Sequence, residues 1–393
     1  MKCPSVSIII PTRNRQRYAN ETVRTILSYN SPIEIIIQDN SDENTLSSLM
    51  ADILDDERVV YHHIDNRIAG VDNYNLAAQY ATGDFFCAIG DDDIVLPNIL
   101  DCAAWMKRNH VDAVLPSKRL TYFWPNDNQK NAKNSFLGIG EFSCIMRELN
   151  PEAGVVALLK NGGQGYLSFP MIGSYHDLVR TDKMREVYRK TGRYYGGLSP
   201  DMYSAVCLSL LPDIRAVSID YPMTLPGVCS VSTSAQADKG QHIGSLKDAP
   251  HFIGLLEPYQ WDSMVPEIYT VQTIWCETML HAIRKMGREE LIDLYFNREE
   301  LINRIYADNL EHKEFILEHI KEEDKKLIKY DAAAQVQRGM FAARIKYASN
   351  LLLGKRKRLY GCRSIGQAGV EIQKYLSKRN RKAKWDKIMA SEQ

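Results

Sequence analysis

The sequence has no apolar run of about 18 residues, the length that a helix needs to span a bilayer. Its opening run, MKCPSVSIII, stops at Pro11 and is too short for a signal peptide. The eight cysteines are scattered without a Cys-x-x-Cys pair, and several lie in apolar segments typical of a core. These absences exclude a transmembrane protein and a cysteine metal site, and they indicate a soluble or peripheral protein of the reducing cytoplasm.

The chain also lacks net charge, but its charges are unevenly divided. Residues 337–393 hold fifteen Lys or Arg against three acidic residues, a balance of +12, which leaves 34 against 46, or −12, for the rest. Such asymmetry is typical of a tail with a separate task. The segment GMFAARIKYASNLLLGKRKR is a basic amphipathic helix in pattern, which suits peripheral contact with the inner face of an anionic membrane. Alternatively, this helix packs on the acidic region before it, and nucleic-acid binding is the least favoured interpretation.

Apolar strand patterns alternate with helical patterns over the first hundred residues. Each strand pattern is followed by a polar turn and then by apolar residues at helical spacing. This alternation predicts an α/β protein with a parallel, doubly wound sheet, whose ligands bind beyond the carboxyl ends of the strands. The expected strands are SVSIIIP, IEIIIQ, RVVYHHID and FFCAIG.

The remainder of the chain is less regular. Short strands and Gly-rich loops follow the first half of the sheet, then a long polar segment, then helices rich in charged residues. The helical region could also form a homo-oligomer interface. We expect a domain at 1–230 with halves 1–110 and 111–230, a mobile loop at 231–250, a helical extension at 251–335, and a basic tail at 336–393.

Four motifs occur in a telling order: IIIPTRNR, IIIQDNSDE, NYNLAAQYATGD and FFCAIGDDDIVLP. In this order they resemble the donor-binding half of a family 2 glycosyltransferase of the GT-A fold, closely over residues 4–105 and loosely to about 230. The resemblance implies a Rossmann-like, mostly parallel sheet with an appended helical extension. It also implies inverting transfer of a sugar from a nucleoside-diphosphate donor, preferably a UDP-sugar, to a glycan or lipid-linked saccharide in surface polysaccharide synthesis.

The acidic run GDDD raises the question of which cation lies beside it, because adjacent like charges repel one another. Carboxylates suit Mg²⁺ or Mn²⁺, which would neutralise a diphosphate leaving group. Gly90 stands where the first residue of the family's Asp-x-Asp pattern would be, so the resemblance assigns the ribose to Asp91 and the metal to Asp92, with Asp93 as a supporting or alternative ligand. His242 could complete the coordination, although a lone loop histidine is more often solvated. The alternative for the whole run is a solvated acidic turn.

Several other residues bind the donor in the family. Asp39 would accept the imide N–H of a uracil-type base, unless it forms an Asx turn or a helix cap. Arg13 and Arg15 are alternatively surface cations, and Asn75 alternatively binds backbone. The resemblance assigns donor contacts to Pro11, Thr12, Arg13, Arg15, Asp39, Asn75 and Asp91.

An inverting transferase also needs a general base. In GGLSPDMYSAVCLSLL, Asp201 lies in the first turn of an expected helix, where the family places this base. An aspartate there also favours the helix dipole without any catalysis. Asp177 and Asp220 are less well placed alternatives.

Two other functions compete with a transferase. A sugar nucleotidyltransferase would carry a Gly-rich loop after the first strand, whereas PTRNR has no glycine. A catalytically inactive glycan-binding or scaffold protein is suggested only by Gly90.

Overall fold

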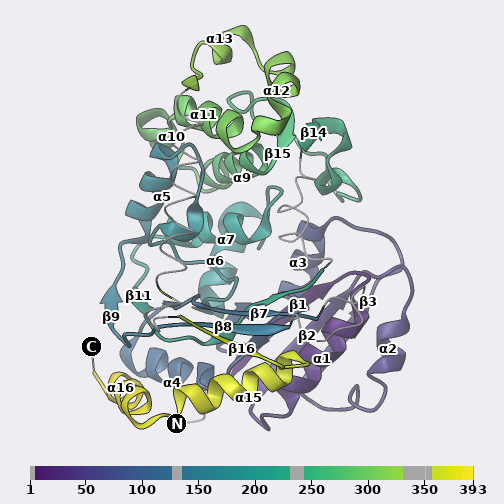
Figure 1. The fold of residues 1–393 in the computed structure, drawn as a ribbon, viewed down its shortest axis with the longest axis vertical. Helices are drawn as coiled ribbons and strands as arrows, with labels where there is room; N and C mark the ends of the chain where they lie inside the picture. Colours follow the sequence, from purple (N-terminus) through teal and green to yellow (C-terminus); the bar gives the residue numbers. More distant parts are fainter. Residues whose placement is uncertain (1–4, 126–134, 231–242, 331–349, 351–355, 393) are drawn as a thin grey trace.

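The computed structural model describes residues 5–125, 135–230, 243–330, 350 and 356–392. Its centre, within these residues, is an eight-stranded sheet (Figure 1). In spatial order the strands are β3 (Val59–His63), β2 (Ile33–Asp39), β1 (Val6–Thr12), β4 (Phe85–Ala88), β10 (Leu178–Arg180), β6 (Ala113–Pro116), β11 (Ala216–Ile219) and β9 (Met146–Glu148). The strands from β3 to β4 are parallel, as are β6 and β11, whereas β10 and β9 run antiparallel to their neighbours. The predicted mostly parallel α/β sheet is therefore confirmed.

The strands are buried on both faces, which explains their unbroken apolar runs. Ile8 and Ile10 of β1 face one core cluster, and Ile9 faces the other. The first cluster lies under α1 (Gln16–Leu27) and α4 (Ile99–Asn109). The second lies under α3 (Gly70–Gln79), α5 (Pro151–Lys160), α6 (Thr181–Thr191) and α7 (Pro200–Ser209). Of the other helices in this part of the chain, α2 (Thr45–Leu49) is a short one after β2.

The predicted helical extension stacks on α5 and α7, on the second face of the sheet (Figure 1). Its apolar residues, such as Leu301 and Ile316, join the second core cluster, so the extension shares a core with the sheet. Its elements are β15 (Ile268–Thr270), α9 (Val271–Lys285), α10 (Glu289–Tyr295), α11 (Arg298–Asp308), α12 (Lys313–His319) and α13 (Glu322–Lys325).

The described end of the chain differs from the basic tail that we expected at 336–393. Residues 356–392 fold as β16 (Arg356–Tyr360), α15 (Ile365–Leu376) and α16 (Arg379–Met389), and they pack on the donor half rather than on the acidic helices. Strand β16 completes a four-stranded sheet of β13 (Gly227–Val228), β7 (Leu120–Phe123), β8 (Phe136–Gly140) and β16. Trp385 of α16 is buried against Tyr221, with ring centroids 4.5 Å apart. Much of the amphipathic pattern, residues 339–349 and 351–355, lies outside the described residues.

Part of the expected mobile loop is also ordered. Residues 243–245 form β14 (Ile243–Ser245), which pairs with β15. We expected a loop because the segment has few large apolar residues, but main-chain pairing with β15 does not require them. Residues 231–242 lie outside the described part. Among the helices that the structure describes, none has the length and apolar character to cross a membrane.

Candidate active site

Three loops meet at the carboxyl ends of the parallel strands. Thr12 at the end of β1 pairs in register with Asp39 at the end of β2, and the turn Gly90–Asp93 follows β4. The Thr12 hydroxyl donates a 2.6 Å hydrogen bond to Asp91 Oδ2. The segment after β12 (Thr224–Leu225), which pairs with β5 (Ile94–Val95), closes over the turn. A Cβ on Gly227 would lie 1.9 Å from the Asp92 carbonyl oxygen, so only glycine permits this approach.

Arg15 lies between the first two carboxylates of the acidic run. Its Nη1 is 2.7 Å from Asp91 Oδ1, and its Nη2 is 2.8 Å from Asp92 Oδ2. The Cys229 amide donates a further hydrogen bond of 3.1 Å to Asp92 Oδ2. Arg15 is therefore a counter-ion of the acidic run, and its donor contact stays a prediction.

Asp93 is held by four groups from three segments. His176 Nε2 lies 3.2 Å from Asp93 Oδ2, and the Tyr175 hydroxyl donates to the same oxygen at 3.1 Å. The amides of Gly90 and Gly227 donate to Oδ2 and Oδ1, each at 2.7 Å. Asp93 is thus a structural anchor of the site, which suits the supporting role we considered better than that of a ligand.

A steric reason explains why position 90 is a glycine. A Cβ at this position would lie 2.9 Å from Asp93 Oδ2 and 3.2 Å from both Asp92 Oδ1 and the Tyr175 hydroxyl. The departure from the Asp-x-Asp pattern therefore leaves room for the Asp93 anchor.

The three carboxylates have different protonation behaviour, although all are buried. Burial raises the pKa of Asp91 to about 7 against the opposing charge of Arg15. Burial and the charge of Asp93 raise the pKa of Asp92 to about 6. Burial would also raise the pKa of Asp93, but the charge and hydrogen bond of His176 and the Gly90 and Gly227 amides outweigh it and lower that pKa. Asp93 is the carboxylate that stays most firmly charged.

The carboxylates at the sheet ends fit a divalent cation that is bound by the protein and a ligand together. Within the described residues, no group of three or more His, Cys, Asp or Glu side chains could hold a metal unaided. Mg²⁺ usually takes one or two carboxylates and completes its shell with phosphates and water. Asp92, whose Oδ1 does not take part in the ion pair with Arg15, suits this arrangement. His242, proposed to complete the shell, lies outside the described residues.

The other residues that the resemblance assigns to binding of the sugar donor mostly form hydrogen bonds and ion pairs within the protein. Asp39 Oδ1 accepts a hydrogen bond from the Ser41 amide, which is the Asx turn we weighed as an alternative, and Oδ2 accepts one from the Tyr61 hydroxyl. Arg13 donates to the Asn40 carbonyl at 2.5 Å and also pairs with Asp42. It therefore orders the loop after β2. Pro11 lies within β1, opposite Gln38.

Asn75 and Asn73 brace the site from α3. The Asn75 amide oxygen accepts from the backbone amides of Tyr194 and Tyr195, and its nitrogen donates to backbone carbonyls, so the structure shows the backbone role that we left open. Asn73, which sequence reasoning missed, donates to the carbonyls of Thr12 and Gln38, each at 3.2 Å. It therefore ties together the ends of β1 and β2.

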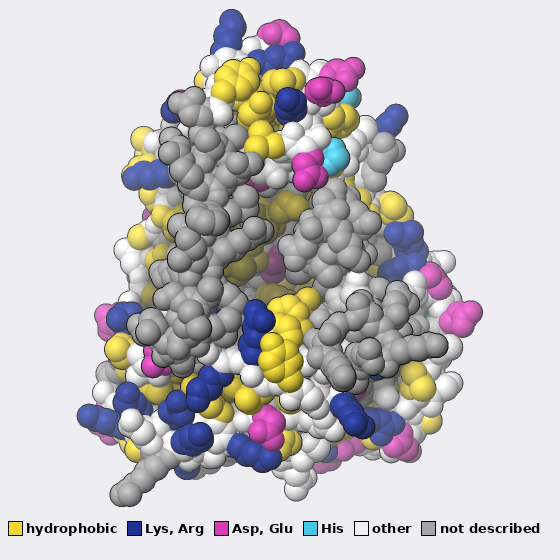
Figure 2. Space-filling model, viewed as in Figure 1, with side chains coloured by type: hydrophobic (Ala, Val, Ile, Leu, Met, Phe, Trp, Pro, Cys, Tyr) yellow, Lys and Arg dark blue, Asp and Glu magenta, His cyan; other side chains and the backbone are white. Residues whose placement is uncertain are grey.

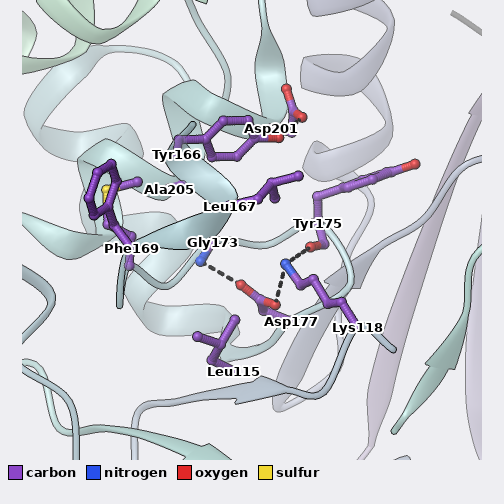
Figure 3. A pocket seen from close by; sticks show the side chains of 11 residues that line it. Leu115, Lys118, Tyr166, Leu167, Phe169, Gly173, Tyr175, Asp177, Asp201 and Ala205 are labelled. Carbon is purple, nitrogen blue, oxygen red and sulfur yellow. Dashed lines mark hydrogen bonds and ion pairs between the residues drawn. The ribbon is translucent and has the colours of Figure 1, made fainter. Parts of the chain in front are cut away.

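Asp201 lines a pocket beside this acidic run (Figure 3). It lies in the first turn of α7, where Ser199 donates to its Oδ1 at 2.5 Å and the Tyr166 hydroxyl donates to its Oδ2. Lys118 and Asp177 form an ion pair of 3.0 Å elsewhere in the pocket wall. Apolar walls complete it: Leu115, Leu167, Phe169, Met171 and Ala205.

Tyr175 connects this pocket to the acidic run. Its backbone carbonyl accepts from Lys118 at 3.4 Å, while its hydroxyl donates to Asp93. Sequence reasoning missed Tyr166, Tyr175, His176 and Lys118, because no motif or periodicity marked them. Of the alternative bases, Asp177 shares the pocket, whereas Asp220 binds Ser143 and lies elsewhere.

Comparison with known proteins now assigns the first part of the chain. Residues 7–157 match the model of the family described as Glycosyl transferase family 2. This part of the chain is a family 2 glycosyltransferase domain. The matched residues include the sheet ends, the acidic run and the helices α1 and α3 that position them. The matched residues end before the segment that supplies Tyr175, His176 and Asp201.

Curated relatives resemble a quarter of the chain. A Campylobacter jejuni protein named GalNAc(5)-diNAcBac-PP-undecaprenol beta-1,3-glucosyltransferase is 33% identical over 25% of this chain and 32% of its own. The putative colanic acid biosynthesis glycosyl transferase WcaA of Escherichia coli is 32% identical over 25% of this chain and 36% of its own. The chain thus spans about a third of the length of these relatives. A solved structure of S. aureus TarS 1-349 in complex with UDP-GlcNAc is 14% identical, with a TM-score of 0.47 over 84% of this chain and 87% of that one.

Proposed function

We propose that this protein transfers a sugar, with inversion, from a UDP-sugar to a glycan or lipid-linked saccharide in surface polysaccharide synthesis. The observation that carries the proposal is the convergence of Thr12, Arg15, Asp91 and Asp92 at the sheet ends of a family 2 domain, beside a pocket that contains Asp201. Two relatives are named for an undecaprenol-linked acceptor and for colanic acid synthesis, which supports the acceptor class.

Four carboxylates have a role in this reaction. Asp39, whose oxygens keep acceptor capacity beside the Ser41 and Tyr61 hydrogen bonds, would discriminate for uracil. Asp91 would bind the ribose hydroxyls, and Asp92 would hold Mn²⁺ or Mg²⁺. When bound, the cation supplies positive charge to the diphosphate leaving group. Asp201 takes the proton from the acceptor hydroxyl as that oxygen attacks the anomeric carbon and the bond to the diphosphate breaks.

The test is hydrolysis of a panel of UDP-, GDP- and dTDP-sugars with and without Mn²⁺. We expect cleavage of a UDP-sugar that requires the cation, and we expect Asp92→Ala to lower it by at least about 100-fold, because the leaving-group charge is no longer neutralised. The matched control is Asp65→Ala, which removes a carboxylate that is 96% exposed. Equal activity of Asp92→Ala and the control would refute the role of Asp92.

The same panel separates the alternative functions. A nucleotidyltransferase would release pyrophosphate from a nucleoside triphosphate and a sugar phosphate, and an inactive scaffold would turn over nothing. The described loop after β1 packs against Asn40 and Asp42, with no glycine cradle for a triphosphate, which disfavours the first.

The proposal extends to where the protein works. Residues 356–392 hold eleven Lys or Arg against three acidic residues, a balance of +8. Basic side chains gather over the lower part of the face in Figure 2, where α15 and α16 lie. Lys382, Lys384 and Lys387 are exposed on α16, so this surface suits contact with an anionic bilayer that presents a lipid-linked acceptor.

We expect the protein to bind vesicles of phosphatidylcholine and phosphatidylglycerol, and not of phosphatidylcholine alone. Each cation near such a surface contributes about 1 kcal/mol, so Lys382→Glu, Lys384→Glu and Lys387→Glu together should weaken binding on the order of 100-fold. The measurement is co-sedimentation, with Arg189→Glu and Lys190→Glu on α6 as the control pair of exposed charges. Similar binding by both variants would show that this surface is not the contact.

A further inference from the structure

Arg15 takes the place beside the acidic run in which a cation was expected. Its guanidinium spans Asp91 and Asp92 with contacts of 2.7 and 2.8 Å, and its side chain is 20% exposed. Arg15 is the residue directly before α1, so its backbone is fixed by the helix while its side chain crosses the site. The acidic pair is thus partly neutralised by the protein itself.

This ion pair leaves hydrogen-bonding capacity unused. Arg15 Nε is buried without a hydrogen-bond partner in the described part of the chain, and Asp91 Oδ1 has the ion pair but no well-aligned hydrogen bond. A guanidinium in its final position usually satisfies its donors, often with two parallel bonds to one carboxylate. The contrast with Asp93, whose oxygens have four donors, is clear.

Arg15 also contacts the carboxylate that the proposed function gives to the divalent cation. Asp92 Oδ2 lies 2.8 Å from Arg15 Nη2, so a metal ion cannot bind this oxygen while the guanidinium stays there. Beside Asp91 and Asp92, the charge of Arg15 would also repel a second cation. A metal ion bound through Asp92 Oδ1 would still lie beside this guanidinium, so the two cations compete for the same carboxylate.

We propose that Arg15 is a resident counter-ion which the divalent cation displaces from Asp92, and that the released guanidinium then pairs with the diphosphate of the donor. This inference rests on the proposed function, because it takes Asp92 as the ligand. It makes cation and donor binding cooperative: the donor gives Arg15 a new anionic partner and so lowers the cost of vacating Asp92. By reciprocity, the cation must tighten donor binding by the same factor.

The test is the binding of Mn²⁺, followed by the electron paramagnetic resonance of the free ion, with and without UDP. The proteins are the wild type, Arg15→Gln, and the control Arg24→Gln, whose guanidinium on α1 pairs with the exposed Asp52 instead. We expect Arg15→Gln to bind Mn²⁺ alone at least about tenfold more tightly than the wild type, although it loses a contact of the site. We also expect UDP to tighten Mn²⁺ binding in the wild type and in Arg24→Gln, and much less in Arg15→Gln.

Unchanged or weaker binding of Mn²⁺ alone by Arg15→Gln would overturn the inference, as would equal effects of UDP on all three proteins. Arg15→Lys keeps the charge and should bind Mn²⁺ as weakly as the wild type, which provides the test if Arg15→Gln does not fold. Asp92→Ala separates this inference from the proposed function. If Asp92→Ala binds Mn²⁺ as the wild type does, the cation assignment itself fails; if it loses Mn²⁺ while Arg15→Gln is unaltered, only the role of Arg15 fails.

Discussion

Replacing Asp201 with asparagine should lower the rate of sugar transfer by about 10²- to 10⁴-fold and leave donor binding nearly unchanged. The amide cannot accept the proton of the acceptor hydroxyl, but it retains the size of the carboxyl group and one oxygen that can accept from Ser199 or from Tyr166. The loss should therefore be in kcat with acceptor present. The measurement is steady-state transfer, together with UDP binding by calorimetry.

The matched control tests whether Asp201 serves only to interact with the dipole of α7. Asp182 occupies the first turn of α6 as Asp201 occupies that of α7, but it is exposed and pairs with Arg180. Asp182→Asn should cost a few tenths of a kcal/mol of stability through the helix dipole and leave kcat unchanged. If Asp201→Asn behaves in the same way, its carboxylate serves only the helix, and Asp177, which shares the pocket, becomes the base to test.

A substitution at Tyr166 tests the role of the Asp201 carboxylate with a smaller change. Its hydroxyl donates to Asp201 and its ring packs against Trp275 with centroids 5.5 Å apart, so Tyr166→Phe removes one hydrogen bond and keeps the packing. A base that is held in place by this bond should lose part of its rate, whereas the KM for the donor should stay constant.

The sequence contained enough information for the sheet and for the meeting of the three loops. Ile8, Ile9 and Ile10 are buried on both faces, which is why unbroken apolar runs predicted parallel strands. Parallel strands place their carboxyl ends at one edge, so Thr12, Asp39 and the acidic run had to lie near one another. The family match of residues 7–157 covers this same region.

The partners of the acidic run could not be predicted in this way. His176 and Gly227 reach Asp93 from segments 83 and 134 residues further along the chain, and Cys229 reaches Asp92 from 137 residues away. Such contacts depend on how the irregular middle folds, which no local pattern specifies. Arg15 was expected to bind the donor because the motif contains it, but its ion pairs follow from the direction of a single side chain.

The end of the chain illustrates a different limit. Its many cations suggested a basic tail that contacts a membrane or packs on the acidic region, because charge dominates the composition of 356–392. The apolar residues Ile365, Ala368, Ile372 and Leu376 nevertheless recur at helical spacing and are buried in the first core cluster. Composition therefore predicted the charged outer face of α15 and missed its buried face.

Replacing Asp93 with alanine should have the largest effect on stability, a loss of about 3–5 kcal/mol in the free energy of unfolding. The substitution removes the ion-pair partner of the buried His176, and it removes the acceptor for the Tyr175 hydroxyl and the Gly90 and Gly227 amides. Buried donors without acceptors are costly because the folded protein cannot replace the water they lose. The measurement is urea unfolding, with the exposed Asp65→Ala as a control that should stay within about 0.5 kcal/mol of the wild type.

The wild type and Asp93→Ala differ in their free energy of unfolding, and the pH dependence of this difference shows whether Asp93 acts through its charge or only fills space. The pKa of Asp93 is lowered in the folded protein, so its ionised form stabilises the fold above the ordinary aspartate pKa of about 3.9. The stability that Asp93 contributes should therefore be constant near neutral pH and should diminish as the pH falls below about 4. A deficit of Asp93→Ala that is the same at every pH would mean that packing alone is lost. A deficit that follows the charge would show that the acidic run needs one permanently ionised carboxylate to hold the turn, which leaves Asp91 and Asp92 available for ligands.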